Sequence, residues 1–284
     1  MEGEKKWRMK IRFWGVRGSI PTPGPLTAKI GGNTSCVEVR AGENLIILDG
    51  GTGMRPLGLS LLDQMPVEGI VLFSHFHWDH IQGFPFFAPF YFPENRFCLY
   101  GRRGLKPSLR KALSQQMRPP NFPIRIDQMG ARIFIRNLRE GEDLLFDGIR
   151  IMNMTLNHPN TSTSFRIEHD GASLVYATDT EHPPEGIDNG LVRFAEGADI
   201  LIYDSQFTTE EYQGNDWTGR PKNNWGHSTP YEGINIARSA GIRRLILFHH
   251  DPSHDDETVQ RIEEECRLEF PGAQAAYEGL EISI

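Results

Sequence analysis

The sequence has few cysteines, no long apolar run and no excess of positive charge. Among 284 residues there are only three cysteines, Cys36, Cys98 and Cys266, and no two of them form a CxxC pair. A disulfide framework and a cysteine-rich zinc module are therefore excluded. The most apolar stretch, residues 81–93, contains three prolines and is shorter than the roughly 20 residues that a membrane-spanning helix needs.

The charge balance is mildly acidic. Thirty Lys and Arg residues against 37 Asp and Glu residues give a formal net charge of −7, which disfavours a globally basic protein that binds nucleic acids or membrane surfaces. The start of the chain, residues 1–6, is charged and lacks the apolar segment of a secretory signal. We therefore expect a soluble, cytoplasmic, reduced globular protein, organised as a single domain over residues 1–284.

Short runs of β-branched and aromatic residues recur along the whole chain and predict strands. The expected strands lie near residues 9–14, 35–40, 45–49, 70–74, 97–100, 131–136, 149–155, 164–168, 173–177, 199–203, 243–248 and 280–283. Helical patterns lie near residues 53–64, 104–117, 188–196, 230–240 and 256–268. Strands dominate the first half and helices become denser later, so we expect an α/β domain of layered sheets flanked by helices.

The strongest chemical signal is an H-x-H-x-D-H motif at residues 75–80, directly after the apolar run 70–73. In an extended segment residues two apart face the same way, so His75 and His77 would present two imidazoles together. Asp79 and His80 follow where the chain turns and can serve a second ion. Imidazole and carboxylate groups are suitable ligands for zinc, manganese or iron.

Two ions need more ligands than this motif supplies. His158, Asp179 and the pair His249 and His250 each follow an apolar run, which is how a ligand held at a rigid strand end would look. The residues alone leave open whether His249 or His250 is the last ligand.

The order of these residues resembles the metallo-β-lactamase superfamily, and within it the ribonuclease Z and phosphodiesterase branch. The likeness covers about residues 10–250. The segments that carry it are Asp-Gly-Gly-Thr-Gly at 49–53, the motif at 75–80 with Ile-Gln-Gly at 81–83, Asn-His-Pro at 157–159, Tyr-Ala-Thr-Asp-Thr at 176–180, Gly-His-Ser-Thr at 226–229 and Leu-Ile-Leu-Phe-His at 245–249.

This resemblance implies a four-layer αββα sandwich that holds two divalent metal ions at one sheet edge, zinc first, with manganese or iron as alternatives. The implied ligands are His75, His77 and His158 for one ion, Asp79, His80 and His249 for the other, and Asp179 as the bridge. The family pattern favours His249 over His250, because the ligand follows the last hydrophobic residue of a strand.

Phosphodiester hydrolysis fits this site best, because no nucleophilic cysteine or serine elbow accompanies the histidines and aspartates. Two adjacent metals lower the pKa of a shared water, so we expect a metal-bridging hydroxide to attack phosphorus. His227, just before the predicted helix at 230–240, is the candidate proton donor, a role taken from the family. Asp79 and His227 are the predicted catalytic residues.

The expected substrate is a small or cyclic nucleotide phosphodiester. The alternatives are a ribonuclease Z-like RNA-processing endonuclease, hydrolysis of a β-lactam, thioester or lactone, and a non-catalytic metal-dependent binding module. Where ribonuclease Z carries His-Glu-Ala-Thr, this chain reads Tyr-Asp-Ser-Gln at 203–206, which disfavours tRNA 3′-end processing.

Two further stretches could contact substrate. The aromatic run 84–92 could stack a nucleobase, but a core segment or a partner interface, including that of a homodimer, is the simpler interpretation. Within the basic run 102–118, Arg103, Lys106 and Arg110 would share one face of a helix, which would be either solvated or used to steer phosphates.

Overall fold

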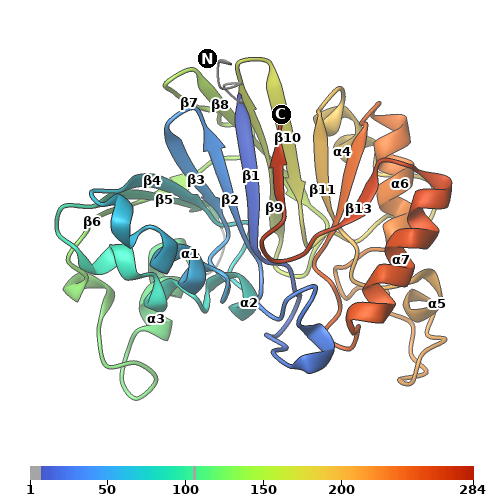
Figure 1. The fold of residues 1–284 in the computed structure, drawn as a ribbon, viewed down its shortest axis with the longest axis horizontal. Helices are drawn as coiled ribbons and strands as arrows, with labels where there is room; N and C mark the ends of the chain where they lie inside the picture. Colours follow the sequence, from blue (N-terminus) through green and yellow to red (C-terminus); the bar gives the residue numbers. More distant parts are fainter. Residues whose placement is uncertain (1–7, 105–106) are drawn as a thin grey trace, which may run out of the picture.

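The computed structural model describes residues 8–104 and 107–284, which form two seven-stranded sheets packed face to face with helices on both outer sides (Figure 1). Helices α1, α2 and α3 lie on the first sheet, and α4, α6 and α7 lie on the second. This arrangement confirms the expected four-layer αββα sandwich.

The first sheet is antiparallel from β14 to β3 and parallel from β3 to β6. Its strands, in spatial order, are β14 (Glu281–Ser283), β1 (Met9–Gly15), β2 (Cys36–Ala41), β3 (Asn44–Leu48), β4 (Glu68–Leu72), β5 (Arg96–Arg102) and β6 (Arg132–Leu138). The helices on this side are α1 (Met54–Ser60), α2 (Trp78–Ile81) and α3 (Leu109–Gln116).

The second sheet is parallel from β13 to β10 and antiparallel from β10 to β7. Its strands are β13 (Ala273–Ala275), β12 (Arg244–Phe248), β11 (Ile200–Asp204), β10 (Ala172–Ala177), β9 (Ser162–His169), β8 (Ile149–Leu156) and β7 (Leu144–Phe146). The helices that follow along the chain are α4 (Asn189–Ala195), α5 (Thr209–Tyr212), α6 (Pro230–Ser239) and α7 (Asp256–Glu269). Single 3₁₀ turns lie at Pro25–Thr27, Leu62–Gln64, Phe84–Phe86, Ala88–Tyr91 and Ile126–Gln128.

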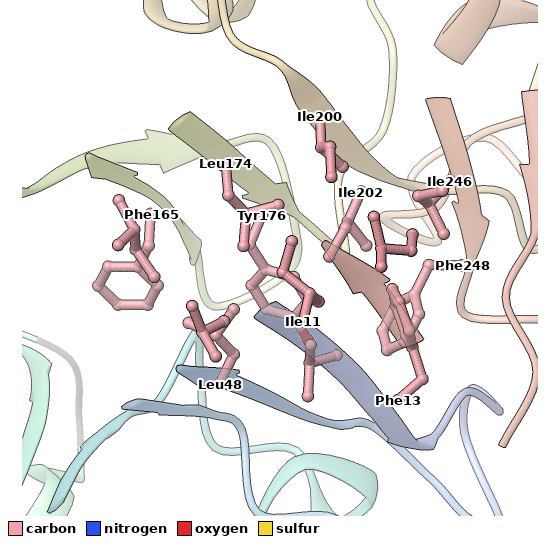
Figure 2. Packing of buried hydrophobic residues seen from close by; sticks show 14 of the residues in the cluster. Ile11, Phe13, Leu48, Phe165, Leu174, Tyr176, Ile200, Ile202, Ile246 and Phe248 are labelled. Atoms are coloured by element: carbon pink, nitrogen blue, oxygen red, sulfur yellow. The ribbon is translucent and has the colours of Figure 1, made fainter. Parts of the chain in front are cut away.

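The main apolar core lies between the two sheets (Figure 2). Strand β1 alternates and sends Ile11 and Phe13 into the core, where Phe13 packs against Phe248 of the opposite sheet. Strands β10 and β11 are buried along their whole length because helices cover their other face, which explains their nearly continuous apolar sequence. The strands that carry the site are therefore held rigidly on both sides.

The aromatic run 84–92 belongs mainly to a second core, between the first sheet and its helices. Phe84, Phe87 and Phe90 are fully buried there, and their rings pack edge to face or tilted against one another. Phe86 is exposed and packs against Phe122. The three buried rings cannot reach a substrate, so the core interpretation holds for most of this run.

Each of the expected strands and helices has a counterpart, but the structure differs in detail. The expectation omits the three-residue edge strands β7 and β13, although it includes β14, which is equally short. It also omits the single-turn helices α2 and α5. Within the described chain, no helix is long and apolar enough to cross a membrane.

The helix expected at 104–117 begins only at Leu109, because Gly104 has a φ of 99° and Ser108 is extended. Arg103 therefore precedes the helix and does not share a face with Arg110, which corrects the expectation. Lys106, the third member of that predicted face, lies outside the described residues. The helix expected at 230–240 is α6, whose cap is Thr229 and whose first residue is Pro230.

Candidate metal centre

The residues predicted as ligands all follow strand ends at one edge of the sandwich. Strands β3 and β4 run parallel in one sheet, and β10, β11 and β12 run parallel in the other, so the carboxyl ends within each set lie together. Strand β8 is antiparallel to β9, which is antiparallel to β10, so β8 ends at the same edge as β10. This edge carries the loops after β4, β8, β10 and β12 and the short helix α2 (Figure 1).

One group consists of His75, His77, His158 and Asp179, whose potential ligand atoms lie within 4.8 Å of one another. Nδ1 of His77 is 3.1 Å from Nε2 of His158. Oδ2 of Asp179 is 3.6 Å from Nε2 of His75 and 3.8 Å from Nε2 of His158. Three imidazoles and one carboxylate therefore converge on a single position.

A second group consists of Asp79, His80, Asp179 and His249, and it is completely buried. Oδ2 of Asp79 lies 3.2 Å from Nε2 of His80 and 3.2 Å from Nε2 of His249. Oδ1 of Asp179 lies 3.2 Å and 3.3 Å from the same two nitrogens. Asp179 therefore presents one oxygen to each group, which is the geometry that a bridging carboxylate requires.

Metal ions would satisfy the imidazole nitrogens that face the centre better than the described residues do. Nε2 of His75 is buried and has no hydrogen-bond partner among the described residues. Nε2 of His80 faces Nε2 of His249 at 3.3 Å, and each ring has its Nδ1 engaged elsewhere. Because two imidazole lone pairs facing each other repel, a cation between them satisfies both, and the donor set of histidine and aspartate suits zinc.

Contacts behind the ligands orient each ring. Nδ1 of His80 is 2.8 Å from Asp49, Nδ1 of His158 is 2.8 Å from the carbonyl oxygen of Gly226, and Nδ1 of His249 is 3.0 Å from Oε1 of Gln206. With these Nδ1 atoms as donors, the Nε2 atoms keep their lone pairs for the centre. Sequence reasoning missed Asp49 and Gln206 in this role.

Asp49 is held by three further donors, the backbone amide and hydroxyl of Ser74 and the hydroxyl of Tyr176. Asp49, Asp179 and His249 all have positive φ angles, of 60°, 54° and 64°. Such backbone is unfavourable for residues other than glycine, and it aims each side chain out of its strand toward the centre.

Burial and charge affect the two groups differently. Burial lowers the pKa of His75 well below its usual range, and it also lowers the pKa of His77 and of His158. These imidazoles are therefore neutral at neutral pH, as ligands must be.

In the second group burial also opposes the charged form, but Asp179 and Asp79 outweigh it and raise the pKa of His249 to about 9. Asp179, Asp79 and Asp49 likewise raise the pKa of His80 well above its usual range. The carboxylates that stabilise a proton on His80 and His249 would equally stabilise a metal ion that displaces those protons.

The two adjacent histidines, His249 and His250, lie in different surroundings. His249 reaches the centre, whereas Nε2 of His250 donates to the carbonyl oxygen of Ala276 on the other side. The loop after β1 closes over this end, because the backbone amide of Ser19 donates to Asp79 and a Cβ on Gly18 would lie 2.4 Å from the His249 ring. A side chain at position 18 would therefore displace His249.

His227 lies at the edge of the centre and is partly exposed. Its Nδ1 is 2.8 Å from Oδ2 of Asp204, and its ring stacks on that of His249 at 5.0 Å. Asp204 also accepts the backbone amide of Ser228. Sequence reasoning missed Asp204 as a partner of His227, although its position at the end of the buried strand β11 is the same signal that identified Asp179.

Comparisons with known proteins agree with this geometry. The family model of the Beta-lactamase superfamily domain matches residues 44–250. A protein named Ribonuclease Z from Metallosphaera sedula is 26% identical over 302 aligned positions, covering 93% of this chain and 94% of that protein.

Two solved structures share the fold at lower identity. The zinc-bound PqqB of Methylobacterium extorquens superposes with a TM-score of 0.74 at 16% identity, covering 97% of this chain and 100% of that one. A diphosphatase of the PhnP family superposes with a TM-score of 0.69 at 18% identity, covering 98% of each chain.

The chain belongs to the β-lactamase superfamily, and its two-sheet sandwich is the metallo-β-lactamase fold. Membership confirms the resemblance seen in the sequence and the metal-binding hydrolase class that it implied.

Proposed function

We propose that the protein is a phosphodiesterase with two divalent metal ions, with zinc as the preferred metal, and that its substrate is a small or cyclic nucleotide. His75, His77 and His158 would hold one ion, Asp79, His80 and His249 the other, and Asp179 both. The observation that carries this proposal is that the two carboxylate oxygens of Asp179 face two separate sets of ligands. Two such ions lower the pKa of bound water and neutralise charge on a phosphoryl group.

His227 would donate the proton that the leaving alkoxide needs. Asp204 fixes Nδ1 of the ring as the donor to its own carboxylate, so Nε2 is the atom available for the substrate. The Asp204 carboxylate also holds the ring in the orientation that presents Nε2, as the aspartate does in other His–Asp pairs. Asp79 contributes in a different way, because its carboxylate lies between His80 and His249 and sets the charge of the second metal position.

RNA processing is the second candidate, since the relative named Ribonuclease Z aligns along nearly the whole chain. The Tyr-Asp-Ser-Gln segment at 203–206 weighs less against it than the sequence suggested. Asp204 supplies a carboxylate at the place of the glutamate in His-Glu-Ala-Thr, and it pairs with His227. A small substrate remains our first choice because the sequence shows no long inserted arm for gripping tRNA.

The test is a substrate panel on the metal-loaded protein. It compares kcat/KM for 2′,3′- and 3′,5′-cyclic nucleotides, bis(p-nitrophenyl) phosphate, a tRNA precursor, nitrocefin and a thioester. We expect the highest value with a cyclic nucleotide and loss of turnover in Asp79→Asn. A preference for the tRNA precursor would favour the second candidate, and a preference for nitrocefin or the thioester would overturn phosphodiester chemistry.

A further inference from the structure

A cavity of about 550 Å³ lies beside the metal centre, between α2 and α3. Phe76, Trp78, Ile81 and Gln82 form its wall on one side, and Gln115 and Asn121 belong to the opposite side. Its volume is within the range of roughly 300–1,000 Å³ that is usual for small-molecule sites. Neither the phosphodiester chemistry nor the ligand set uses these residues.

The cavity and the candidate metal centre are lined by one shared segment of the chain, residues 75–82. Phe76 and Trp78 alternate with His75, His77 and Asp79, and successive Cα atoms are about 3.8 Å apart. One set of side chains in this segment faces the cations and the other faces the cavity. Trp78 lies between His77 of the first ligand group and Asp79 of the second, so of the residues that line the cavity it adjoins both groups in sequence.

The lining has the chemistry of a site for a flat, uncharged, polar ring. No charged side chain lines the cavity within residues 8–104 and 107–284. Two aromatic side chains, Phe76 and Trp78, are present, and Trp78 is 80% exposed, so its ring is open to a ligand. Aromatic faces of this kind stack bases at single-stranded nucleic-acid sites.

The side-chain amides in the lining also suit a nucleobase. Gln82 is held in place by donating to the hydroxyl of Thr34, whereas the side chains of Gln115 and Asn121 make no hydrogen bond to any described residue. Each amide offers both a donor and an acceptor, which is what the edge of a nucleobase requires. An acyl chain would offer these amides no partner, and a charged group would find no counter-charge among the described residues of the lining.

We propose that this cavity is the base-binding subsite, with Trp78 as the stacking platform and Gln115 and Asn121 as contacts to the base edge. The inference rests on the proposed function and narrows it to substrates that carry a nucleobase. Base stacking is thereby assigned to Trp78 of the motif segment and not to the aromatic run 84–92, in which Phe84, Phe87 and Phe90 are buried.

The first experiment compares two diesters with the same leaving group, thymidine 5′-(p-nitrophenyl phosphate) and methyl p-nitrophenyl phosphate. The measured quantity is the ratio of their kcat/KM values on the metal-loaded protein. We expect Trp78→Ala to lower this ratio about tenfold, because base–aromatic stacking is worth about 1–3 kcal/mol. Trp78→Phe, which keeps an aromatic face, should retain most of the preference.

Trp217→Ala is the matched control, because Trp217 is 89% exposed and does not line the cavity. It should keep the parental ratio. The inference is overturned if Trp78→Ala keeps that ratio as well, or if Trp217→Ala lowers it by the same factor. Circular dichroism checks that each variant retains the fold.

A second readout does not depend on turnover. Calorimetric titration with adenosine 5′-monophosphate should show binding that weakens in Trp78→Ala and in the double variant Gln115→Ala/Asn121→Ala. If no diester is hydrolysed but this binding depends on Trp78, the proposed function fails and the subsite stands. If diesters are hydrolysed while Trp78 and the two amides affect neither binding nor the ratio, the function stands and the subsite is wrong.

Discussion

At the scale of single residues, the site depends on which nitrogen each histidine presents. Asp49, the carbonyl oxygen of Gly226 and Gln206 occupy the Nδ1 atoms of His80, His158 and His249. Buried polar groups of this kind cost free energy unless they are paired, so the remaining Nε2 atoms need a partner too. Metal ions at the centre meet that need for several rings at once.

The pair His227 and Asp204 yields a prediction about the leaving group. Asp204→Asn should lower kcat by roughly 100-fold for a diester with an alkoxide leaving group, the low end of the effect of a general acid. The loss should be much smaller with p-nitrophenolate, which leaves without a proton. Steady-state kinetics on the two substrate types measures the difference.

The control for that substitution lies on the same strand. Asp199 precedes β11 at its opposite end, where it accepts from the backbone amide of Ser173. Asp199→Asn should leave the ratio between the two substrate types at its parental value. Equal losses on both substrates in Asp204→Asn would show that Asp204 supports the fold and not proton transfer.

At the scale of elements, the carboxylate of Glu181 holds the loop that carries Gly226 and His227 through hydrogen bonds. Glu181, which is mostly buried, accepts the backbone amides of Asn224 and Gly226 at 2.7 and 2.9 Å and the hydroxyl of Tyr212. Gly226 has a φ of 86°, and a Cβ there would lie 2.2 Å from Nδ1 of His158. The loop can lie this close to His158 only because residue 226 is a glycine.

Glu181→Gln should therefore lower both stability and metal affinity. Hydrogen bonds to a charged group are worth about 1.5–3 kcal/mol, and an amide can accept at only one of its two ends. Chemical denaturation and competition with a chelator measure the two effects. Tyr212→Phe removes one donor to Glu181 and should produce a smaller loss of metal affinity; a larger loss than in Glu181→Gln would contradict this role.

Elements with strong patterns were predictable from the sequence, and short ones were not. Strands β10 and β12 carry the apolar runs 174–177 and 245–248, and Pro230 marks the start of α6. Strand β13, with the sequence Ala-Gln-Ala, pairs only because β12 lies beside it, so no local signal could reveal it.

The same distinction applies to the site. The motif at 75–80 can be recognised from the sequence alone because its members are adjacent in the chain. Asp204 acts on His227 across 23 positions and Asp49 acts on His80 across 31 positions. Their roles follow from which strands become neighbours in the sandwich, which is tertiary information that residue types and spacing do not contain.

At the scale of the whole molecule, the candidate ligands come from both sheets. The motif at 75–80 follows β4 of the first sheet, and His158, Asp179 and His249 follow strands of the second. Ions bound to this set join the two sheets at one edge, in addition to the apolar core between them. Binding to the folded state alone must also stabilise it.

Removal of the metal should therefore lower the unfolding temperature. A ligand at 100 times its Kd adds about 2.7 kcal/mol to the free energy of unfolding. Differential scanning calorimetry before and after chelation should show a lower Tm, with recovery on adding back zinc. An unchanged Tm would mean that the ions do not link the two sheets.

The most direct test of the central claim is the metal content of the purified protein, measured by inductively coupled plasma mass spectrometry. The two groups that share Asp179 predict about two transition-metal ions per chain. Asp79→Asn should retain about one, because the three-histidine group remains intact. A fully folded, metal-supplemented chain that holds no transition metal would contradict the account.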